Sequence, residues 1–246
     1  MPPWQTLERA LTSDGSELTL CRLGDRFALR VDGQELMHSN SHGSEEKLAV
    51  HGCAALAGKS GARVLVGGLG MGFTARAALD ALAPDAELVV VEAVAEVIGW
   101  NRDPALLGQL ARMPLADRRL SVIQGDVADA IEASPDRYDA ILLDVDNGPT
   151  ALSTFKNRRL YSPDGLALAR RALRDKGVLA VWSTFQDARF TARLRQARFE
   201  ARTKRVLAGD GTRRRHILWL ARPAGDHLGL GREVSSLKRY RTPATI

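Results

Sequence analysis

The sequence has few cysteines, few aromatic residues and no long apolar run, and each scarcity excludes a class of protein. Its 246 residues include two cysteines, Cys21 and Cys53, which form neither a disulfide framework nor a Cys-x-x-Cys metal pair. Aromatic residues make up 5% of the chain, and none alternate with basic clusters as a base-stacking surface would require. No segment approaches the roughly 20 apolar residues that span a bilayer, and no secretory signal pattern is visible. We therefore expect a soluble, cytoplasmic protein without a membrane partner.

The net charge of +6 is the one compositional feature that suggests an anionic partner. We favour the simpler interpretation that the arginines are solvated on helix faces, and we expect no nucleic-acid partner. The basic run Arg213–His216 lies beside a predicted turn, where a solvated loop is the better interpretation. His38, His42 and His51 lie near one another, but no acid or cysteine stands at metal-ligand spacing, so we expect no metal.

The chain divides into three predicted regions. Residues 1–43 contain short segments of alternating polar and apolar residues, which predict a small N-terminal antiparallel β domain. Residues 44–222 alternate strand-like and helical segments, beginning with Ser44 as a predicted N-cap, and this favours a parallel sheet with helices on both faces. Among these segments we predict strands over 87–92 and 120–124 and helices over 104–113 and 127–132. Residues 223–246 are basic with little apolar pattern, so we predict a flexible tail.

The end of the central region identifies the fold class more narrowly. Two strand-like segments, 199–208 and 215–222, are joined by a Gly-Asp-Gly-Thr sequence with the chemistry of a hairpin turn. A parallel sheet that finishes in an antiparallel hairpin is typical of the Rossmann-like, class I S-adenosylmethionine methyltransferase-type fold. We therefore predict an α/β protein of this class.

A glycine-rich turn opens the predicted sheet. The apolar run Val64–Val66 meets a cluster of glycines, and an alanine- and leucine-rich helical segment, 74–82, follows. Strand, tight glycine turn and helix together are typical of nucleotide binding, because the helix N-terminus offers free N–H groups and the glycines let a ligand approach the backbone. The candidate ligand-binding residues in this turn are Gly68, Gly70 and Gly72.

Acidic residues follow the next three predicted strands. Ligands of doubly wound sheets bind outside the carboxyl ends of the strands, so these acids are expected in one site. Glu92 follows the glycine turn by about 20 residues, where an acid accepts hydrogen bonds from ribose hydroxyls. Asp126 suits the exocyclic amine of adenine or a helix N-cap, and both roles can coexist. Asp144 stands where the reactive end of the ligand should lie, and a carboxylate there can take a proton from an amine.

With these motifs in view, the sequence resembles the spermidine synthase family of aminopropyltransferases from about residue 32 to residue 222. The matching stretches are Val64–Gly72, Val91-Glu92, Gly125-Asp126-Val127, Tyr138–Asp144 and Leu160–Asp164. The resemblance implies transfer of the aminopropyl group of decarboxylated S-adenosylmethionine to an amine, with methylthioadenosine released. It also implies Glu92 on ribose, Asp126 and Val127 on adenine, Asp144 as the catalytic base, and a homodimer formed through the N-terminal strands.

The sequence departs from the family pattern where the family binds its donor amine and its acceptor. Met71 occupies the position of an aspartate that holds the donor's amine in the family. Glu45-Glu46 resembles the family's acidic pair, but Ala49 and Val50 replace the polar residues expected next. The segment after the base is shortened, with Asp146 as the second carboxylate. The substrate-binding candidates are therefore Asp146 and Glu46.

Three functions follow from the sequence. The first is aminopropyl transfer from decarboxylated S-adenosylmethionine to a small-molecule amine. The second is methyl transfer from intact S-adenosylmethionine, since Met71 would not repel the carboxylate of that donor. The third is a homologue without activity, which a buried and paired Asp144 would favour.

Overall fold

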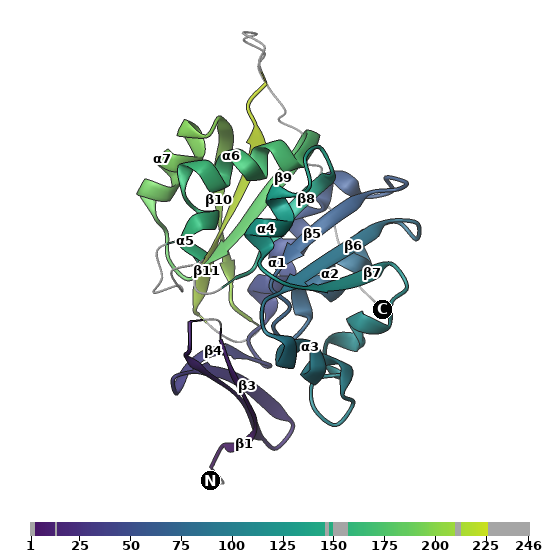
Figure 1. Cartoon of the computed structure of the whole chain (residues 1–246), viewed down its shortest axis with the longest axis vertical. Helices are drawn as coiled ribbons and strands as arrows, with labels where there is room; N and C mark the ends of the chain where they lie inside the picture. Colours follow the sequence, from purple (N-terminus) through teal and green to yellow (C-terminus); the bar gives the residue numbers. More distant parts are fainter. Residues whose placement is uncertain (1–2, 13, 146–147, 150–156, 210–212, 226–246) are drawn as a thin grey trace, which may run out of the picture.

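The computed structural model describes residues 3–12, 14–145, 148–149, 157–209 and 213–225. The candidate Asp146 and most of the predicted tail therefore lie outside the described residues. No helix in these ranges is long and apolar enough to span a membrane. Two sheets account for the architecture, and the smaller one lies at one end of the larger (Figure 1).

The small sheet is antiparallel and contains four strands in chain order. Its last two strands are joined by Asp32 and Gly33, which both have positive φ angles (47° and 78°), as the sequence pair predicts for a tight hairpin turn. The predicted N-terminal β sheet is thus present, with one strand more than the three recognised in the sequence. Its strands are β1 (Gln5–Leu11), β2 (Glu17–Leu23), β3 (Arg26–Val31) and β4 (Gln34–His38).

The large sheet has seven strands in the order β10-β11-β9-β8-β5-β6-β7. The pairs from β9 through β7 are parallel, and β11 pairs antiparallel with both β9 and β10. This is the predicted methyltransferase-type sheet with its terminal hairpin, so the fold prediction is confirmed. The strands are β5 (Arg63–Gly67), β6 (Glu87–Glu92), β7 (Leu120–Gln124), β8 (Tyr138–Leu143), β9 (Leu173–Ser183), β10 (Phe199–Leu207) and β11 (Arg215–Pro223).

Helices cover both faces of the large sheet, and each face has its own core. Along β8, Ala140 and Leu142 pack into one apolar cluster, while Ile141 and Leu143 pack into the other, as the two-residue period of a strand requires. The first cluster takes residues from α1, α2 and α3, and the second from α4, α5, α6 and α7. The helices are α1 (Gly43–Gly52), α2 (Phe73–Ala81), α3 (Ala95–Arg102), α4 (Val127–Glu132), α5 (Asn157–Leu160), α6 (Pro163–Ala172) and α7 (Ala188–Gln196).

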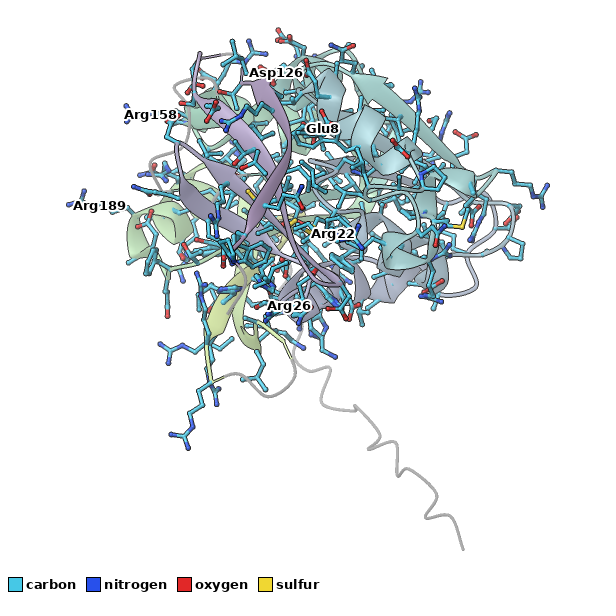
Figure 2. All side chains as sticks on the ribbon, turned by 90° about the horizontal axis from the view of Figure 1, so that it is seen from below. Glu8, Arg22, Arg26, Asp126, Arg158 and Arg189 are labelled. Atoms are coloured by element: carbon cyan, nitrogen blue, oxygen red, sulfur yellow. The ribbon has the colours of Figure 1, made fainter. Side chains whose placement is uncertain are left out.

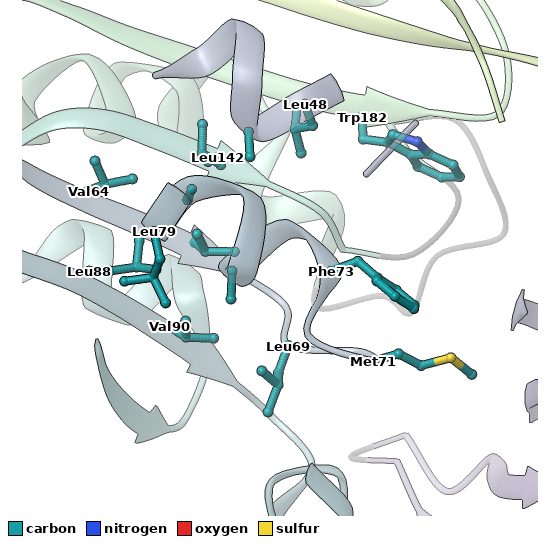
Figure 3. Close-up of a cluster of buried hydrophobic side chains, with 14 of the residues drawn as sticks. Leu48, Val64, Leu69, Met71, Phe73, Leu79, Leu88, Val90, Leu142 and Trp182 are labelled. Carbon is teal, nitrogen blue, oxygen red and sulfur yellow. The ribbon is translucent and has the colours of Figure 1, made fainter. Parts of the chain in front are cut away.

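The first cluster also joins the two sheets. It includes Leu18, Leu20 and Leu29 of the small sheet together with Leu48 of α1 and Leu142 of β8. Figure 3 shows the part of this cluster around Leu48 and Leu142. Burial of a leucine side chain contributes about 2 kcal/mol, so this shared core holds the small sheet against the large one.

Two local predictions were wrong. Ser44 is not the N-cap of α1, because the helix already begins at Gly43 and His42 precedes it; the Ser44 side chain is buried and bonds elsewhere. The expected helix over 104–113 is absent. Leu110–Arg112 and Pro114–Ala116 instead form two separate 3₁₀ turns, divided by Met113 at φ 54°. The carbonyl of Asp103 accepts hydrogen bonds from the N–H groups of both Leu106 and Gly108, which turns the chain before a regular helix can form.

Helix α6 follows its sequence signal closely. Ser162 is its N-cap, with the hydroxyl accepting a hydrogen bond from the N–H of Gly165 at 3.1 Å, and Pro163 occupies the first turn. Trp100 and Trp182 are both buried in the first apolar cluster.

Candidate functional site

Four adjacent strands bring the sequence-predicted residues to one edge of the sheet. In the order β8-β5-β6-β7, the strands are followed by Asp144, the glycine turn, Glu92 and Asp126. The parallel ladder continues just past the strand ends. The N–H of Asp144 donates to Gly67, that of Gly68 to Val91, and that of Gly125 to Glu92, each at 2.9 Å. The residues therefore form one continuous rim, as the alternation of strands and helices predicts.

Glu92 fixes the glycine turn through its carboxylate. Oε2 accepts a hydrogen bond from the N–H of Leu69 at 2.8 Å, and Oε1 accepts one from the N–H of Val94 at 2.9 Å. The side chain is 9% exposed, and burial raises its pKa despite these hydrogen bonds. The backbone N–H groups of Gly70 and Ala93 also act on this carboxylate and lower its pKa, so the turn is gathered around Glu92.

The glycines of the turn are required by the protein itself. Gly68 has φ +89°, and a Cβ there would overlap the backbone carbonyl of Asp144, closer than the 3.0 Å limit of real contacts. At Gly70 a Cβ would meet the Met37 side chain of β4 at 3.0 Å, and at Gly72 it would meet Pro114 at 2.8 Å. Close chain packing therefore explains these glycines before any ligand is considered.

Asp126 acts as the N-cap of α4, one of the two roles that the sequence left open. Its Oδ1 accepts a hydrogen bond from the N–H of Ala128 at 2.8 Å. Val127, the first residue of the helix, is buried against Gly67 of β5. Asp126 also lines a cavity of about 440 Å³ with Gly125, Val91 and Ile123. Figure 2 labels Asp126 near the upper edge of the view from below.

Asp144 lies at one end of the rim, half-buried directly after β8. Its Oδ2 accepts a hydrogen bond from the hydroxyl of Thr74 at the start of α2. Burial raises its pKa to about 6, although the Thr74 hydrogen bond opposes the shift. Among the described residues no cation forms an ion pair with Asp144. The carboxylate is thus mostly ionised at neutral pH and is not neutralised by a lysine or arginine, which is the state that a general base needs.

The acidic pair of α1 splits between the interior and the surface. Glu45 is 5% exposed, and burial together with the charge of Asp144 raises its pKa to about 8. Glu46 faces outward and pairs with His42 Nδ1 at 3.0 Å. Its substrate-binding role stays a prediction, as does that of Asp146. The importance of Glu45 was missed in the sequence, although its neighbour was selected. The helical period distinguishes the buried acid from the exposed one only when it is already known which face of the helix is buried.

Met71 is fully buried and belongs to the first apolar cluster. Figure 3 shows it extending from the turn beside Phe73. The thioether is therefore a packing group, so no carboxylate stands at this place in the turn.

Fold and rim together define an α/β protein of the Rossmann-like methyltransferase type with an added N-terminal β sheet. No protein-family model and no curated protein matches the sequence. Three solved structures are similar over most of the chain. A spermidine synthase in complex with the transition-state analogue AdoDATO has a TM-score of 0.68 and 17% identity, covering 89% of this chain and 72% of that one. Spermidine synthase from Thermotoga maritima has a TM-score of 0.67 and 17% identity, covering 89% and 73%. A probable spermidine synthase from Corynebacterium glutamicum has a TM-score of 0.62 and 18% identity, covering 91% and 81%.

These comparisons show that the chain has the spermidine synthase fold. The resemblance noted in the sequence is confirmed at that level.

Proposed function

We propose that the chain is a spermidine synthase-like transferase that moves the aminopropyl group of decarboxylated S-adenosylmethionine to a small amine. The observation that carries this proposal is the continuous rim of Asp144, glycine turn, Glu92 and Asp126 on four adjacent strands. Each group on the rim suits one part of an adenosyl sulfonium donor. The fold shared with spermidine synthases supports the same choice.

In this proposal Glu92 accepts hydrogen bonds from the ribose hydroxyls, the role of an acid at this place in a doubly wound sheet. Asp126 accepts one from the exocyclic amine of adenine, while the N–H of Val127 donates to a ring nitrogen. The apolar side chains of Val91 and Ile123 line the same cavity as Asp126, and they suit contact with the faces of an aromatic base. The sulfonium end then lies near Asp144.

The proposed reaction is an in-line displacement. The amine nitrogen attacks the aminopropyl carbon bonded to sulfur, the carbon–sulfur bond breaks, and its electron pair stays on the sulfur of methylthioadenosine. Asp144 takes the proton that the amine loses. Holding the two reactants in line supplies much of the rate, because the entropy of bringing them together has already been lost on binding.

Methyl transfer from intact S-adenosylmethionine is the second candidate, and Met71 is the observation that favours it. With a buried thioether in the turn, no carboxylate there repels the carboxylate of intact methionine. Against this, Glu92, Asp126 and Asp144 place three carboxyl groups along the rim, which favours the donor without a carboxylate. We further propose a cytoplasmic location, no nucleic-acid or metal partner, and a homodimer.

The test is incubation of the full chain with each donor and a panel of amines, followed by identification of the nucleoside product. Methylthioadenosine supports the proposal, and S-adenosylhomocysteine supports the second candidate. If neither donor binds in calorimetry, both are wrong.

Asp144→Asn should lower turnover by about 10²- to 10⁴-fold and leave donor affinity within about tenfold, because a base is not mainly a binding group. Asp175→Asn is the matched control, since Asp175 is exposed near the start of β9, at the other end of the sheet. Full activity of the Asp144→Asn variant would show that Asp144 is not the base.

A further inference from the structure

A buried hydroxyl links two titratable side chains beside the rim. Ser44 on α1 is fully buried, and its Oγ lies 2.5 Å from Oε2 of Glu45 and 2.8 Å from Nδ1 of His216 on β11. Glu45 and His216 are each 5% exposed. None of these three residues was selected as a site residue from the sequence. Ser44 and His216 are 172 positions apart, and only the tertiary fold brings them together.

Glu45 also lies next to the proposed base. The backbone carbonyl of Glu45 and the carboxylate of Asp144 both accept from the hydroxyl of Thr74, the former at 3.4 Å. The charge of Asp144 is the second cause, after burial, of the raised pKa of Glu45, at about 8. Asp144 has a pKa of about 6. Between these two pKa values the pair of carboxyl groups therefore holds one proton.

The other charged groups around Glu45 do not compete for that proton. Glu46, on the same helix, raises the pKa of Glu45 only slightly and points toward solvent. The strand β10 packs on α1 as well, but its Arg202 and Lys204 act on His51, at the far end of the helix. From α2 comes the uncharged Thr74.

His216 is able to accept a hydrogen bond at neutral pH. Burial, with a smaller contribution from Arg214, lowers its pKa to about 4, so the ring is neutral. Its plane meets Trp182 edge to face at 4.6 Å between centroids. Nε2 has no hydrogen-bond partner among the described residues. A neutral ring leaves Nδ1 free to accept the Ser44 hydroxyl, and Ser44 in turn can accept the proton of a protonated Glu45.

We propose that Glu45 is a positioning residue for Asp144: it holds the one proton that the two carboxyl groups share, hydrogen-bonded through Ser44 to His216, so that Asp144 stays ionised. The proposal rests on the proposed function, in which Asp144 is the base. In this state Glu45 donates to Ser44, and Ser44 donates to Nδ1 of His216. When Glu45 loses its proton at higher pH, both hydrogen bonds reverse direction: Ser44 donates to Glu45, and His216 must carry a proton on Nδ1. The ring stays neutral throughout and only changes tautomer.

The experiment is an NMR titration of the full chain without substrate, following the side-chain carboxyl carbons and the ring nitrogens of His216. We expect two steps, near pH 6 and pH 8, with the His216 tautomer changing at the upper step. In Glu45→Gln the upper step should disappear. The titration midpoint of Asp144 should shift by less than about 0.5 pH unit, because a neutral amide replaces a carboxyl group that is neutral when Asp144 titrates. In Asp144→Asn the Glu45 midpoint should fall.

Two controls separate this arrangement from general effects of mutation. Glu87→Gln removes the same charge at the opposite end of β6, where Glu87 pairs with Arg63, and should leave both midpoints in place. In Ser44→Ala the His216 tautomer should no longer respond at the upper step, while near-ultraviolet circular dichroism checks the fold.

A fall of one unit or more in the Asp144 midpoint in Glu45→Gln would overturn the proposal, because it would place the shared proton on Asp144. The proposal would also be overturned if the ring-nitrogen signals of His216 in the unmodified chain showed no change of tautomer at the upper step. Since no substrate is used, a failure of aminopropyl transfer would leave these outcomes intact, and the two proposals fail separately.

Discussion

Replacing Gly68 with alanine should destabilise the protein far more than its backbone angle alone requires. Gly68 has φ +89°, and a Cβ would also overlap the carbonyl oxygen of Asp144, a backbone atom that cannot rotate away. Gly15 is a matched control in the turn between β1 and β2, because its φ is +88° and nothing lies within 4 Å of a Cβ there. The two substitutions therefore share the backbone strain and differ only in the overlap.

The strain of a non-glycine residue at such an angle costs about 1–3 kcal/mol, and we expect Gly15→Ala to lose an amount in this range. Gly68→Ala should lose about 2 kcal/mol more, since overpacking against fixed atoms typically costs 1–3 kcal/mol. Urea unfolding of both variants at one pH measures the difference through the midpoint and the slope. Equal losses of unfolding free energy in the two variants would refute the reasoning, because they would mean that the backbone at Asp144 moves away from the added Cβ without destabilising the protein.

Three further predictions follow from single contacts. Ser162→Ala should lower the free energy of unfolding by about 1 kcal/mol in urea, because the N-cap of α6 bonds Gly165 at 3.1 Å; no loss would mean that the cap is replaced by water. Glu45→Gln should gain stability over the unmodified chain as pH rises from 5 to 8. The folded pKa of Glu45, about 8, exceeds its ordinary 4.5, so between these values Glu45 ionises in the unfolded chain but keeps its proton in the folded chain, and the free energy of unfolding falls as pH rises. Glutamine does not ionise and has no such loss. A stability difference that is flat with pH would contradict this burial effect. If Asp144 is the base, kcat/KM should rise about tenfold per pH unit below pH 6 and level off above it, following the Asp144 pKa of about 6; a plateau extending down to pH 4 would exclude Asp144.

The basic run Arg213–His216 divides between the surface and the interior. Arg213, Arg214 and Arg215 are exposed beside the terminal hairpin, whereas His216 turns inward. Figure 2 shows Arg158 and Arg189 extending outward from the ribbon. The exposure of the three arginines in the run agrees with a solvated loop, and the expectation that no nucleic acid binds stays a prediction.

The order of strands and helices was readable from the sequence because it depends on local patterns. The strands Glu87–Glu92 and Leu120–Gln124 and the helix Val127–Glu132 begin and end where their apolar periods predict. The segment 104–113 was misread as a helix, since its apolar residues carry no sign of the hydrogen bonds that Asp103 accepts. Ser44 was wrongly predicted to be an N-cap, because a serine near a helix start can either cap the helix or bond inside the core, and the sequence does not distinguish the two.

The sequence by itself determined the rim. Glycines and acids directly after parallel strands must meet at one edge, since the carboxyl ends of such strands point the same way, and Glu92, Asp126 and Asp144 lie there. Only the tertiary structure decided what surrounds them. It placed Glu45 inside and Glu46 outside, turned Met71 into a core residue, and brought His216 to Ser44 across 172 positions. The physical reason is that strand ends are set by local periodicity, whereas the burial and protonation of a side chain depend on distant segments that happen to pack against it.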